Sequence, residues 1–495
     1  MNRFLGITFL FVLVVCTSQD NGTIGRTKEG VTEASQGNTV TTSGPINNSS
    51  ICQTCDCKAD AINCTARGLD NNLADAVWPA SVLKSVSLEG NSIVHLNKFP
   101  NVTIEKLILS KNKITKIDDA VFIAIKNLTE LDLSHNHLTS SILRPKIFQG
   151  HFSLNEWEPL EKLRILNLGH NNFHTLNQDL FEHITDLKVL SLSGNPLSMI
   201  DHSTLDAIGD LINLEELDLS YCDLQELPDT VFHVPKDTLK LLYLNGNRFT
   251  VVPRALQDAT ALEYLNMNEN PIKILGELNS FPHLPHLKDL RLRSMPELTA
   301  VRAGAFSTLE SLEYLYLDDC RKLSTINEDA LVKHTNHVAI WPPLKGLDIS
   351  DNALEYIPAT LLGRWDKLEQ LDLSNNQWGC NCDNQFLVGN LLPKLGRTLL
   401  GEKVKKLYCA SPPEHAGKTL MSLSNRKLRC PDLYGARPER DAALLVGLMI
   451  GLLMAIPIAM TFFLLWRRGY FFCSEQHPAS FSRAFYKRAS NDDDF

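Results

Sequence analysis

A short leucine frame recurs through the middle of the chain and constrains its fold more than any other feature. The frame is Leu-x-x-Leu-x-Leu-x-x-Asn, and twelve units of it occur between residues 83 and 379. Regular repetition at 20 to 50 residues is the sequence signature of a solenoid, so we expect one stack of similar turns. Position nine recurs about every 26 residues, at Asn91, Asn112, Asn136, Asn171, Asn195, Cys222, Asn247, Asn270, Met295, Cys320, Asn352 and Asn376.

The spacing within the frame predicts one short strand per turn. Alternate residues of a strand face opposite sides, so positions four and six point into the coil while positions three, five and seven point outward. Stacked turns then share one parallel sheet. A single turn cannot bury its leucines, but each neighbour covers them, so at least three turns are needed for stability.

Position nine lies where the chain leaves each strand inside the coil. An Asn amide there both donates to and accepts from buried backbone groups that no regular ladder satisfies. Cys222 and Cys320 are weak substitutes, and they lie too far apart to bond, which predicts two inert buried thiols. Met295 cannot donate, so we expect a local irregularity in the ninth unit. A row of core phenylalanines is expected before the next strand, at Phe122, Phe181, Phe232 and Phe306.

Two intervals break the period. Asn136 to Asn171 spans 35 residues and Cys320 to Asn352 spans 32, so each carries roughly ten extra residues that should emerge as loops. Such loops are either tolerated surface insertions or contacts for a partner.

Two clusters of four cysteines flank the repeats. Their patterns are Cys-x2-Cys-x-Cys-x6-Cys before the first unit and Cys-x-Cys-x26-Cys-x20-Cys after the last, and spacing alone allows three pairings in each. Together with the repeats, they resemble the caps of extracellular leucine-rich-repeat proteins such as Slit, Toll-type receptors and neuronal leucine-rich receptors. The resemblance implies an α/β solenoid, a curved horseshoe whose parallel sheet lines the concave side. It also implies the disulfides Cys52–Cys57, Cys55–Cys64, Cys380–Cys409 and Cys382–Cys430.

The two ends of the chain predict its compartment. Residues 1–18 have a positive start, an apolar run and small residues for cleavage, as a secretory signal peptide does. Residues 442–466 carry no charge and are long enough to span a bilayer. Arg467 and Arg468 follow that segment, so we expect a type I plasma-membrane protein with its C-terminus in the cytosol. The clustered cysteines then face an oxidising compartment, which favours disulfides over zinc ligands.

These features divide the chain into eight expected parts. They are a signal peptide (1–18), a disordered glycosylated segment (19–51), an N-terminal cap (52–82), the repeats (83–379), a C-terminal cap (380–431), a stalk (432–441), a membrane helix (442–466) and a cytoplasmic tail (467–495). Glycosylation is expected at the six Asn-x-Ser/Thr sequons, Asn21, Asn47, Asn48, Asn63, Asn101 and Asn127.

Tyrosine is concentrated at outward positions of units six to ten, which hold five of the ten tyrosines in the chain. Arginine and acidic residues, among them Glu269 and Asp289, lie between them, and tyrosine with arginine is the combination enriched in interface hot spots. The sequence therefore predicts a protein-binding patch, although tyrosine is also a common residue of strands. The predicted ligand-binding residues are Tyr221, Tyr243, Tyr264, Arg291, Arg293, Tyr314 and Tyr316.

Nothing in the sequence predicts an enzyme, a cofactor or a resident metal. Motifs such as His-Glu-x-x-His and Gly-x-Ser-x-Gly do not occur. His135 and His170 both occupy position eight in neighbouring units, so they are exposed surface residues or a pair that titrates together or holds a metal. The net charge of −9 argues against a nucleic-acid partner.

The membrane segment and tail suggest how a signal leaves the molecule. Small residues, including Gly447 and Gly451, recur every four residues and would let a second helix approach, which predicts a homodimer. Cys473 is a palmitoylation candidate just inside the membrane. The terminal residues 493–495, Asp-Asp-Phe, faintly resemble a ligand for a PDZ-type adaptor.

The sequence thus favours a cell-surface recognition or adhesion receptor that binds an extracellular protein through the concave face and signals through adaptors or the membrane helix. The alternative is an innate-immune sensor or co-receptor that presents ligand to another receptor, because a tail of 29 residues is too short for a signalling domain.

Overall fold

The computed structural model describes residues 51–152, 157–158, 160–335, 338–361, 367–430 and 438–468. The expected signal peptide, the sequons at Asn21, Asn47 and Asn48, and the tail from residue 469 with Cys473 lie outside the described residues. Asn63 and Asn101 are exposed and Asn127 is half-buried, and their glycosylation stays a prediction.

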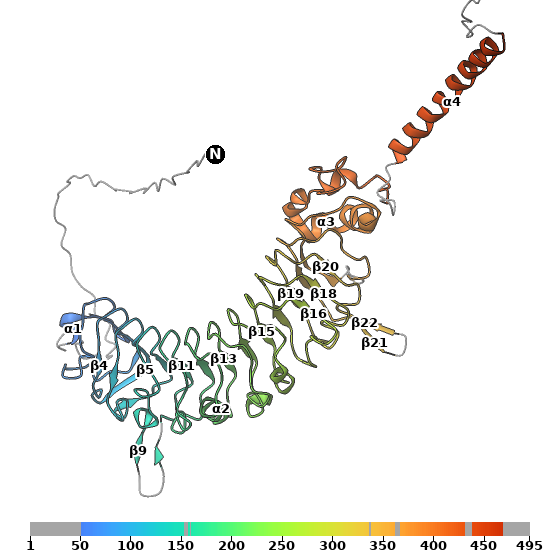
Figure 1. Cartoon of the computed structure of the whole chain (residues 1–495). Helices are drawn as coiled ribbons and strands as arrows, with labels where there is room; N and C mark the ends of the chain where they lie inside the picture. The colour runs from blue at the N-terminus through green and yellow to red at the C-terminus, as the bar shows by residue number, and fades with distance from the viewer. Residues whose placement is uncertain are drawn as a thin grey trace, which may run out of the picture. The chain divides into compact units, whose positions relative to one another are not determined.

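The repeats form a solenoid of twelve turns whose strands lie side by side in one parallel sheet (Figure 1). Each strand pairs in register with the next turn, so that Leu166 lies opposite Leu190 and Leu190 opposite Leu217. The strands, in turn order, are β3 (Leu83–Ser87), β5 (Val102–Ile108), β8 (Glu130–Asp132), β11 (Ile165–Asn167), β12 (Val189–Ser191), β13 (Glu216–Asp218), β14 (Leu241–Tyr243), β15 (Tyr264–Asn266), β17 (Asp289–Arg291), β19 (Tyr314–Tyr316), β23 (Gly346–Asp348) and β24 (Gln370–Asp372).

The inward positions build a continuous core. Residues at positions four and six are at most 4% exposed in all twelve turns, which confirms the expected alternation. The four expected phenylalanines are also buried, and Phe122 stacks between Phe99 and Phe148 with centroid distances of 6.1 and 6.3 Å. Because each turn covers its neighbour, apolar surface would be exposed to solvent only at the two ends of the stack.

The Asn residues at position nine tie successive turns together. In Asn195, Nδ2 donates to the carbonyls of Leu168 in the preceding turn and Leu192 in its own, at 3.0 and 2.7 Å. Its Oδ1 accepts from the backbone N–H groups of Asn171 and Phe173, each at 3.2 Å. These bonds satisfy backbone groups that the short strands leave unpaired inside the coil.

The three turns that lack Asn at position nine follow turns with proline at position ten, namely Pro196, Pro271 and Pro296. After Pro196, the N–H of Leu197 donates to its own Asn195 carbonyl at 2.8 Å rather than to the next turn. The next turn then has one backbone N–H fewer to accept from, and Cys222 Sγ donates to Leu192 O at 3.3 Å.

The sheet stays regular at Met295. Strand β17 of that turn keeps its register with both β15 and β19, so the irregularity expected there is absent from the sheet.

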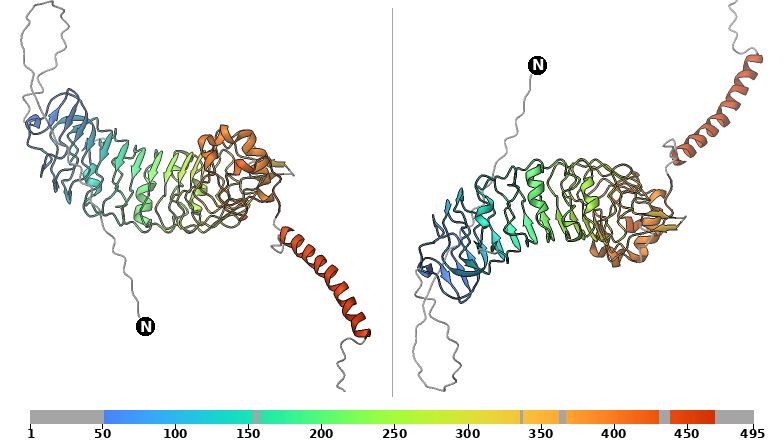
Figure 2. Two further views of the ribbon diagram at one scale, coloured as in Figure 1. Left: turned by 90° about the horizontal axis from the view of Figure 1, so that it is seen from above. Right: turned by 90° about the horizontal axis from the view of Figure 1, so that it is seen from below.

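Smaller elements occur between the twelve strands of the main sheet. They are α2 (His202–Gly209), η3 (Pro235–Asp237), η4 (Arg254–Asp258), the pair β4 (His95–Leu96) and β6 (Lys116–Ile117), β7 (Ile125–Lys126) on β5, and the parallel trio β16 (Ile274–Leu275), β18 (Ala300–Val301) and β20 (Thr325–Ile326). Two views from above and below show α2 on the side of the stack away from the main strands (Figure 2).

The long intervals form hairpins. The first contains η2 (Pro145–Phe148) and the antiparallel pair β9 (His151–Phe152) and β10 (Trp157–Glu158). The second contains the antiparallel pair β21 (Lys333–Thr335) and β22 (Val338–Ile340), and both hairpins project from the stack in Figure 1.

Disulfide-bonded caps cover both ends of the stack. All four pairs implied by the resemblance are present, Cys52–Cys57, Cys55–Cys64, Cys380–Cys409 and Cys382–Cys430. Cys222 and Cys320 are free and buried, as expected. The N-terminal cap holds α1 (Ile51–Thr54), β1 (Asp56–Cys57) and β2 (Ala61–Asn63), and the C-terminal cap holds η6 (Cys382–Asn384), the π-helix η7 (Leu387–Leu391), α3 (Leu392–Leu400), η8 (Gly401–Lys406) and η9 (Leu420–Leu423).

A long apolar helix, α4 (Pro438–Arg467), follows the caps and the solenoid in the sequence. Its segment Ala442–Arg467 has a mean hydropathy of 2.5 and is long enough to cross a membrane.

Candidate functional site

Outward side chains of turns seven to ten form one row across the sheet. The Tyr243 and Tyr264 rings lie 5.2 Å apart between centroids. The guanidinium carbon of Arg291 lies 5.0 Å from the Tyr264 centroid and 5.2 Å from that of Tyr316, and Arg293 lies 4.4 Å from the Tyr316 centroid. We call these five residues the tyrosine–arginine row. It contains five of the seven predicted binding residues.

Strand register brings the row together. Tyr264 pairs with Asp289 and Asn266 with Arg291, so outward side chains of β15 and β17 are separated by one strand spacing of about 4.8 Å. At that spacing a guanidinium reaches the face of a neighbouring ring, where the cation–π attraction contributes about 0.5–1 kcal/mol at an exposed site. The row is therefore held in place before any ligand arrives.

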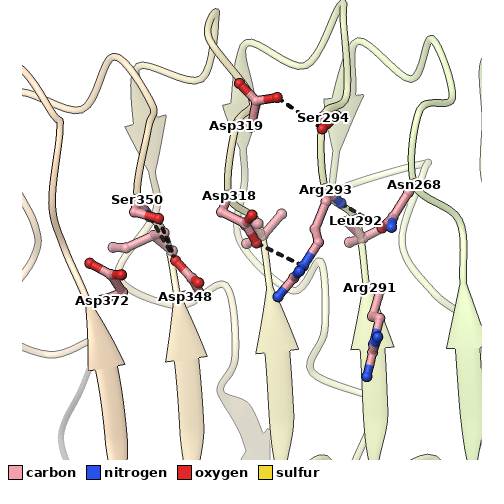
Figure 3. Close-up of polar contacts among 12 residues, drawn as sticks. Asn268, Arg291, Leu292, Arg293, Ser294, Asp318, Asp319, Asp348, Ser350 and Asp372 are labelled. Carbon is pink, nitrogen blue, oxygen red and sulfur yellow. Dashed lines mark hydrogen bonds and ion pairs between the residues drawn. The ribbon is translucent and has the colours of Figure 1, made fainter. Parts of the chain in front are cut away.

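Both arginines are neutralised by the chain itself. Arg291 donates to both carboxylate oxygens of Asp289 at 3.1 and 3.2 Å, and this pairing raises the pKa of Arg291. Arg293 Nε lies 3.0 Å from Asp318 Oδ1 on the next turn (Figure 3). The guanidinium groups thus present flat, partly exposed faces rather than free positive charge.

The tyrosine hydroxyls of the row are protonated at physiological pH. Burial, followed by the nearby Glu216 carboxylate, raises the pKa of Tyr243 to about 12. Burial also raises the pKa values of Tyr264 and Tyr316. Each hydroxyl can therefore donate a hydrogen bond to a ligand while its ring supplies apolar contact.

Two predicted residues lie outside the row. Tyr314 occupies position three of turn ten, and a Cβ added to Gly346 on the next turn would come within 2.6 Å of its ring. Tyr221 occupies position eight, beyond the strand end, with φ +54°. Its hydroxyl donates to Glu269 Oε1 at 3.1 Å. Tyr221 therefore belongs to the edge of the sheet formed by the residues at position eight, which we call the ridge, rather than to the row.

Acidic residues flank the row and were missed as site residues. Asp318, Asp348 and Asp372 lie on three adjacent turns, ten, eleven and twelve (Figure 3). Lys403 of the C-terminal cap donates to Asp372 Oδ2. Aspartate at position five in two of these units was visible in the sequence, but the arrival of Lys403 from the cap had no local signal.

A ladder of alternating charge runs along position two beside the strands. Lys188 and Lys240 both contact Glu215, at 2.6 and 3.2 Å, and Lys288 contacts Glu263 at 2.7 Å. Each exposed pair contributes about 0–1 kcal/mol. The ladder therefore adds little to stability, and we assign it no ligand.

His135 and His170 are stacked, with ring centroids 4.2 Å apart and an angle of 10° between planes. Ring nitrogens bind metals in the ring plane, so two parallel rings do not converge on one ion. Over the part of the chain that the structure describes, no three His, Cys, Asp or Glu residues group as metal ligands. The described geometry is that of a packing contact between the rings of neighbouring turns.

Comparison with known proteins agrees with this architecture. The leucine rich repeat family model matches residues 102–156, 158–211 and 212–272. The chain is a leucine-rich-repeat protein.

Leucine-rich-repeat relatives match parts of the chain. Lumican of Gallus gallus is 30% identical over 244 residues, covering 48% of this chain and 64% of lumican. CD180 antigen of Mus musculus is 25% identical over 402 residues, covering 74% of this chain and 58% of that protein. The chain thus spans less than two thirds of the length of these relatives.

A solved structure shares the fold. A chain from the octameric complex of latrophilin 3, Unc5D and FLRT2 is 21% identical, with a TM-score of 0.50, and the match covers 76% of this chain and 99% of that chain.

Proposed function

We propose that this leucine-rich-repeat protein is a cell-surface recognition or adhesion receptor that binds a protein ligand through the tyrosine–arginine row. The observation that carries the proposal is the row itself. Five large side chains form an ordered, partly exposed surface on a sheet whose core does not require them. Aromatic and arginine anchors of this kind contribute most of the energy in protein interfaces.

Membrane attachment supports the proposal. Helix α4 is long and apolar enough to anchor the solenoid, and Arg467 and Arg468 at its end favour a cytosolic C-terminus. The solved structure that shares the fold comes from a protein complex that contains FLRT2. Protein binding by this chain is likewise part of the proposal.

The test compares two triple variants of the full chain displayed on cells. Tyr243→Ala, Tyr264→Ala and Tyr316→Ala remove the row, while Ile108→Ala, Ile165→Ala and Val189→Ala trim outward residues of turns two, four and five. Partners are first captured by crosslinking to wild-type cells and then measured against each variant. We expect the tyrosine variant to lose at least about tenfold in affinity and the control to bind as wild type. Equal affinity for wild type and tyrosine variant refutes the proposal.

The co-receptor alternative differs in its need for the tail. Deleting residues 469–495 leaves adhesion or ligand presentation intact but ends signalling through adaptors, so activity of the truncated chain favours adhesion or presentation over signalling. The PDZ-type motif at residues 493–495 and palmitoylation of Cys473 stay predictions within this scheme.

Dimerisation through the membrane helix also stays a prediction. Gly447 and Gly451 lie in α4 with open space around them, so the described helix leaves room for a second one. Equal crosslinking of wild type and a Gly447→Leu, Gly451→Leu variant argues against the dimer.

A further inference from the structure

The sheet face of turns six to twelve carries more acid than base. Three ion pairs are internal to this face, Arg291 with Asp289, Arg293 with Asp318, and Lys403 with Asp372. Three other carboxylates on the same face, those of Glu216, Asp218 and Asp348, have no Lys, Arg or His within ion-pair distance among the described residues. The face therefore keeps negative charge that the chain does not neutralise.

The unpaired carboxylates lie on either side of the tyrosine–arginine row. Glu216 and Asp218 project from β13, one strand before Tyr243, and Asp348 projects from β23, one strand after Tyr316. Five strand steps separate β13 from β23 along the sheet. At about 4.8 Å per step this is roughly 24 Å, the reach of about seven extended residues.

These carboxylates are crowded as well as unpaired. Asp218 accepts hydrogen bonds from Ser191 Oγ at 3.1 Å and from Ser220, and Asp348 accepts from Ser350 (Figure 3). Burial and then the Asp218 charge raise the pKa of Glu216, while burial and then Asp348 raise the pKa of Asp318. A positive charge brought to either place would relieve repulsion that the free protein carries.

The C-terminal cap shows that a side-chain ammonium fits this face. Lys403 reaches Asp372, whose side chain is only 11% exposed, and the Asp372, Asp348 and Asp318 charges all raise the pKa of Lys403. The Lys403 side chain itself remains 55% exposed. It therefore neutralises Asp372, at one end of the three aspartates, and leaves Asp348 accessible to a ligand. A ligand cation arriving at Asp348 would meet repulsion from Lys403.

We propose that the ligand of this face is a protein segment with basic side chains about seven residues apart, one set over Glu216 and Asp218 and the other over Asp348, with apolar residues between them on the tyrosine–arginine row. The inference rests on the proposed function, because it names the chemistry of the partner for the same surface. Charge complementarity indicates that the ligand's end residues are positive, since both arginines of the row are already paired and three carboxylates are not.

The test uses the full chain, purified in an uncharged detergent, and two fluorescent ten-residue peptides. Both have a Gly-Leu-Phe-Leu-Gly-Ser centre, and one has two arginines at each end where the other has two glutamates. Binding is measured by fluorescence anisotropy for wild type, Asp348→Asn, Glu216→Gln and Lys403→Ala. Matched controls are Asp351→Asn, in the same turn as Asp348 but at the ridge, and Lys405→Ala, which pairs with the exposed Glu402 of the cap.

We expect the arginine-ended peptide to bind at least about tenfold more tightly than the glutamate-ended one. Asp348→Asn and Glu216→Gln should each weaken it about fivefold, the size of a partly exposed ion pair, and Lys403→Ala should tighten it about twofold to fivefold. The two control variants should bind as wild type. Tighter binding of the glutamate-ended peptide, absent binding of both peptides, or equal effects of test and control variants overturns the inference.

A captured natural partner separates this inference from the proposed function. If the triple tyrosine variant loses that partner while Asp348→Asn and Glu216→Gln keep it, the face binds protein but the charge assignment is wrong. If all of these variants keep the partner, the face is not the binding surface.

Discussion

The first and second halves of the sheet share one core and differ on their outer face. In turns one to five, positions three and five hold mainly small, aliphatic and amide side chains such as Ser85, Ile108, Ile165, Asn167 and Val189. In turns seven to ten the same positions hold the tyrosines and Arg291 of the row. Inward positions are buried equally in both halves. The repeat therefore fixes the interior and leaves the exterior free to vary, and we propose that ligand binding accounts for the cluster on the exterior.

Core substitutions give the largest expected effect and should not distinguish the halves. Leu190 and Leu265 occupy position four in turns five and eight, and both are fully buried. We expect Leu190→Ala and Leu265→Ala each to destabilise the chain by about 2–5 kcal/mol, because each leaves a cavity between stacked turns. Chemical denaturation followed by tryptophan fluorescence measures both. A negligible loss for one of the pair would show that the two halves do not share a core.

Position nine offers the next largest contrast. The Asn195 side chain bonds several backbone groups through an amide that both donates and accepts. Cys222 offers one thiol, which donates to Leu192 O and whose pKa burial raises to about 12. Replacing Asn195 with Ala leaves buried groups unpaired and should destabilise by about 2–3 kcal/mol, against about 1 kcal/mol for Cys222→Ala. The same denaturation series gives both values. An equal loss would mean that Pro196 does not relieve the next turn of its need for an acceptor.

Aromatic rings lie over glycines in both halves of the sheet. Replacing those glycines with alanine tests this packing and should have a smaller effect on stability. Gly194 (φ +66°) lies under the His170 ring and Gly246 (φ +66°) under the Tyr221 ring, where an added Cβ would be within 2.4 and 2.2 Å. We expect Gly194→Ala and Gly246→Ala each to destabilise by about 1–2 kcal/mol through strain and collision. Adding Tyr221→Ala to Gly246→Ala should restore only the part of the lost stability that comes from the collision with the ring. A fully additive double variant would show that the ring does not lie over the glycine.

The smallest expected effect is the pH dependence of stability that His135 contributes in the first half. Burial, then His170 and Lys111, lower the pKa of His135 below 6.5, while Asp132 opposes the shift. As the pH falls through about 6.5 the unfolded chain therefore takes up a proton at this site before the folded chain does, so stability decreases toward low pH. His135→Asn should make the thermal unfolding midpoint depend less on pH between about pH 7.5 and 5. An unchanged slope would remove His135 as its source.

Periodicity predicted what is local and repetitive. The spacing of leucines located all twelve strands and the phenylalanine row, and the two cysteine clusters located the caps. The disulfide pairs came from resemblance, because spacing alone left three choices at each end. Residues that repeat every turn carry a signal many times over, so single departures do not hide it.

Features that depend on one turn meeting another were harder to predict. Tyr221 shares the outward side with the row, yet position eight turns it over Gly246 toward Glu269. Lys403 reaches Asp372 from a cap that follows the repeats, and no frame position announces it. The link between Pro196 and Cys222 was present in the sequence, but its meaning needed the hydrogen bonds of the turn between them.

Site-specific photocrosslinking from the two halves tests the central claim most directly. Tyr264 and Val189 both occupy position three, on β15 and β12, so a benzophenone amino acid at either residue projects from the same face of the same sheet. On living cells, we predict that residue 264 crosslinks a partner protein and residue 189 does not. Crosslinking of that partner from residue 189 but not from residue 264 would contradict the account.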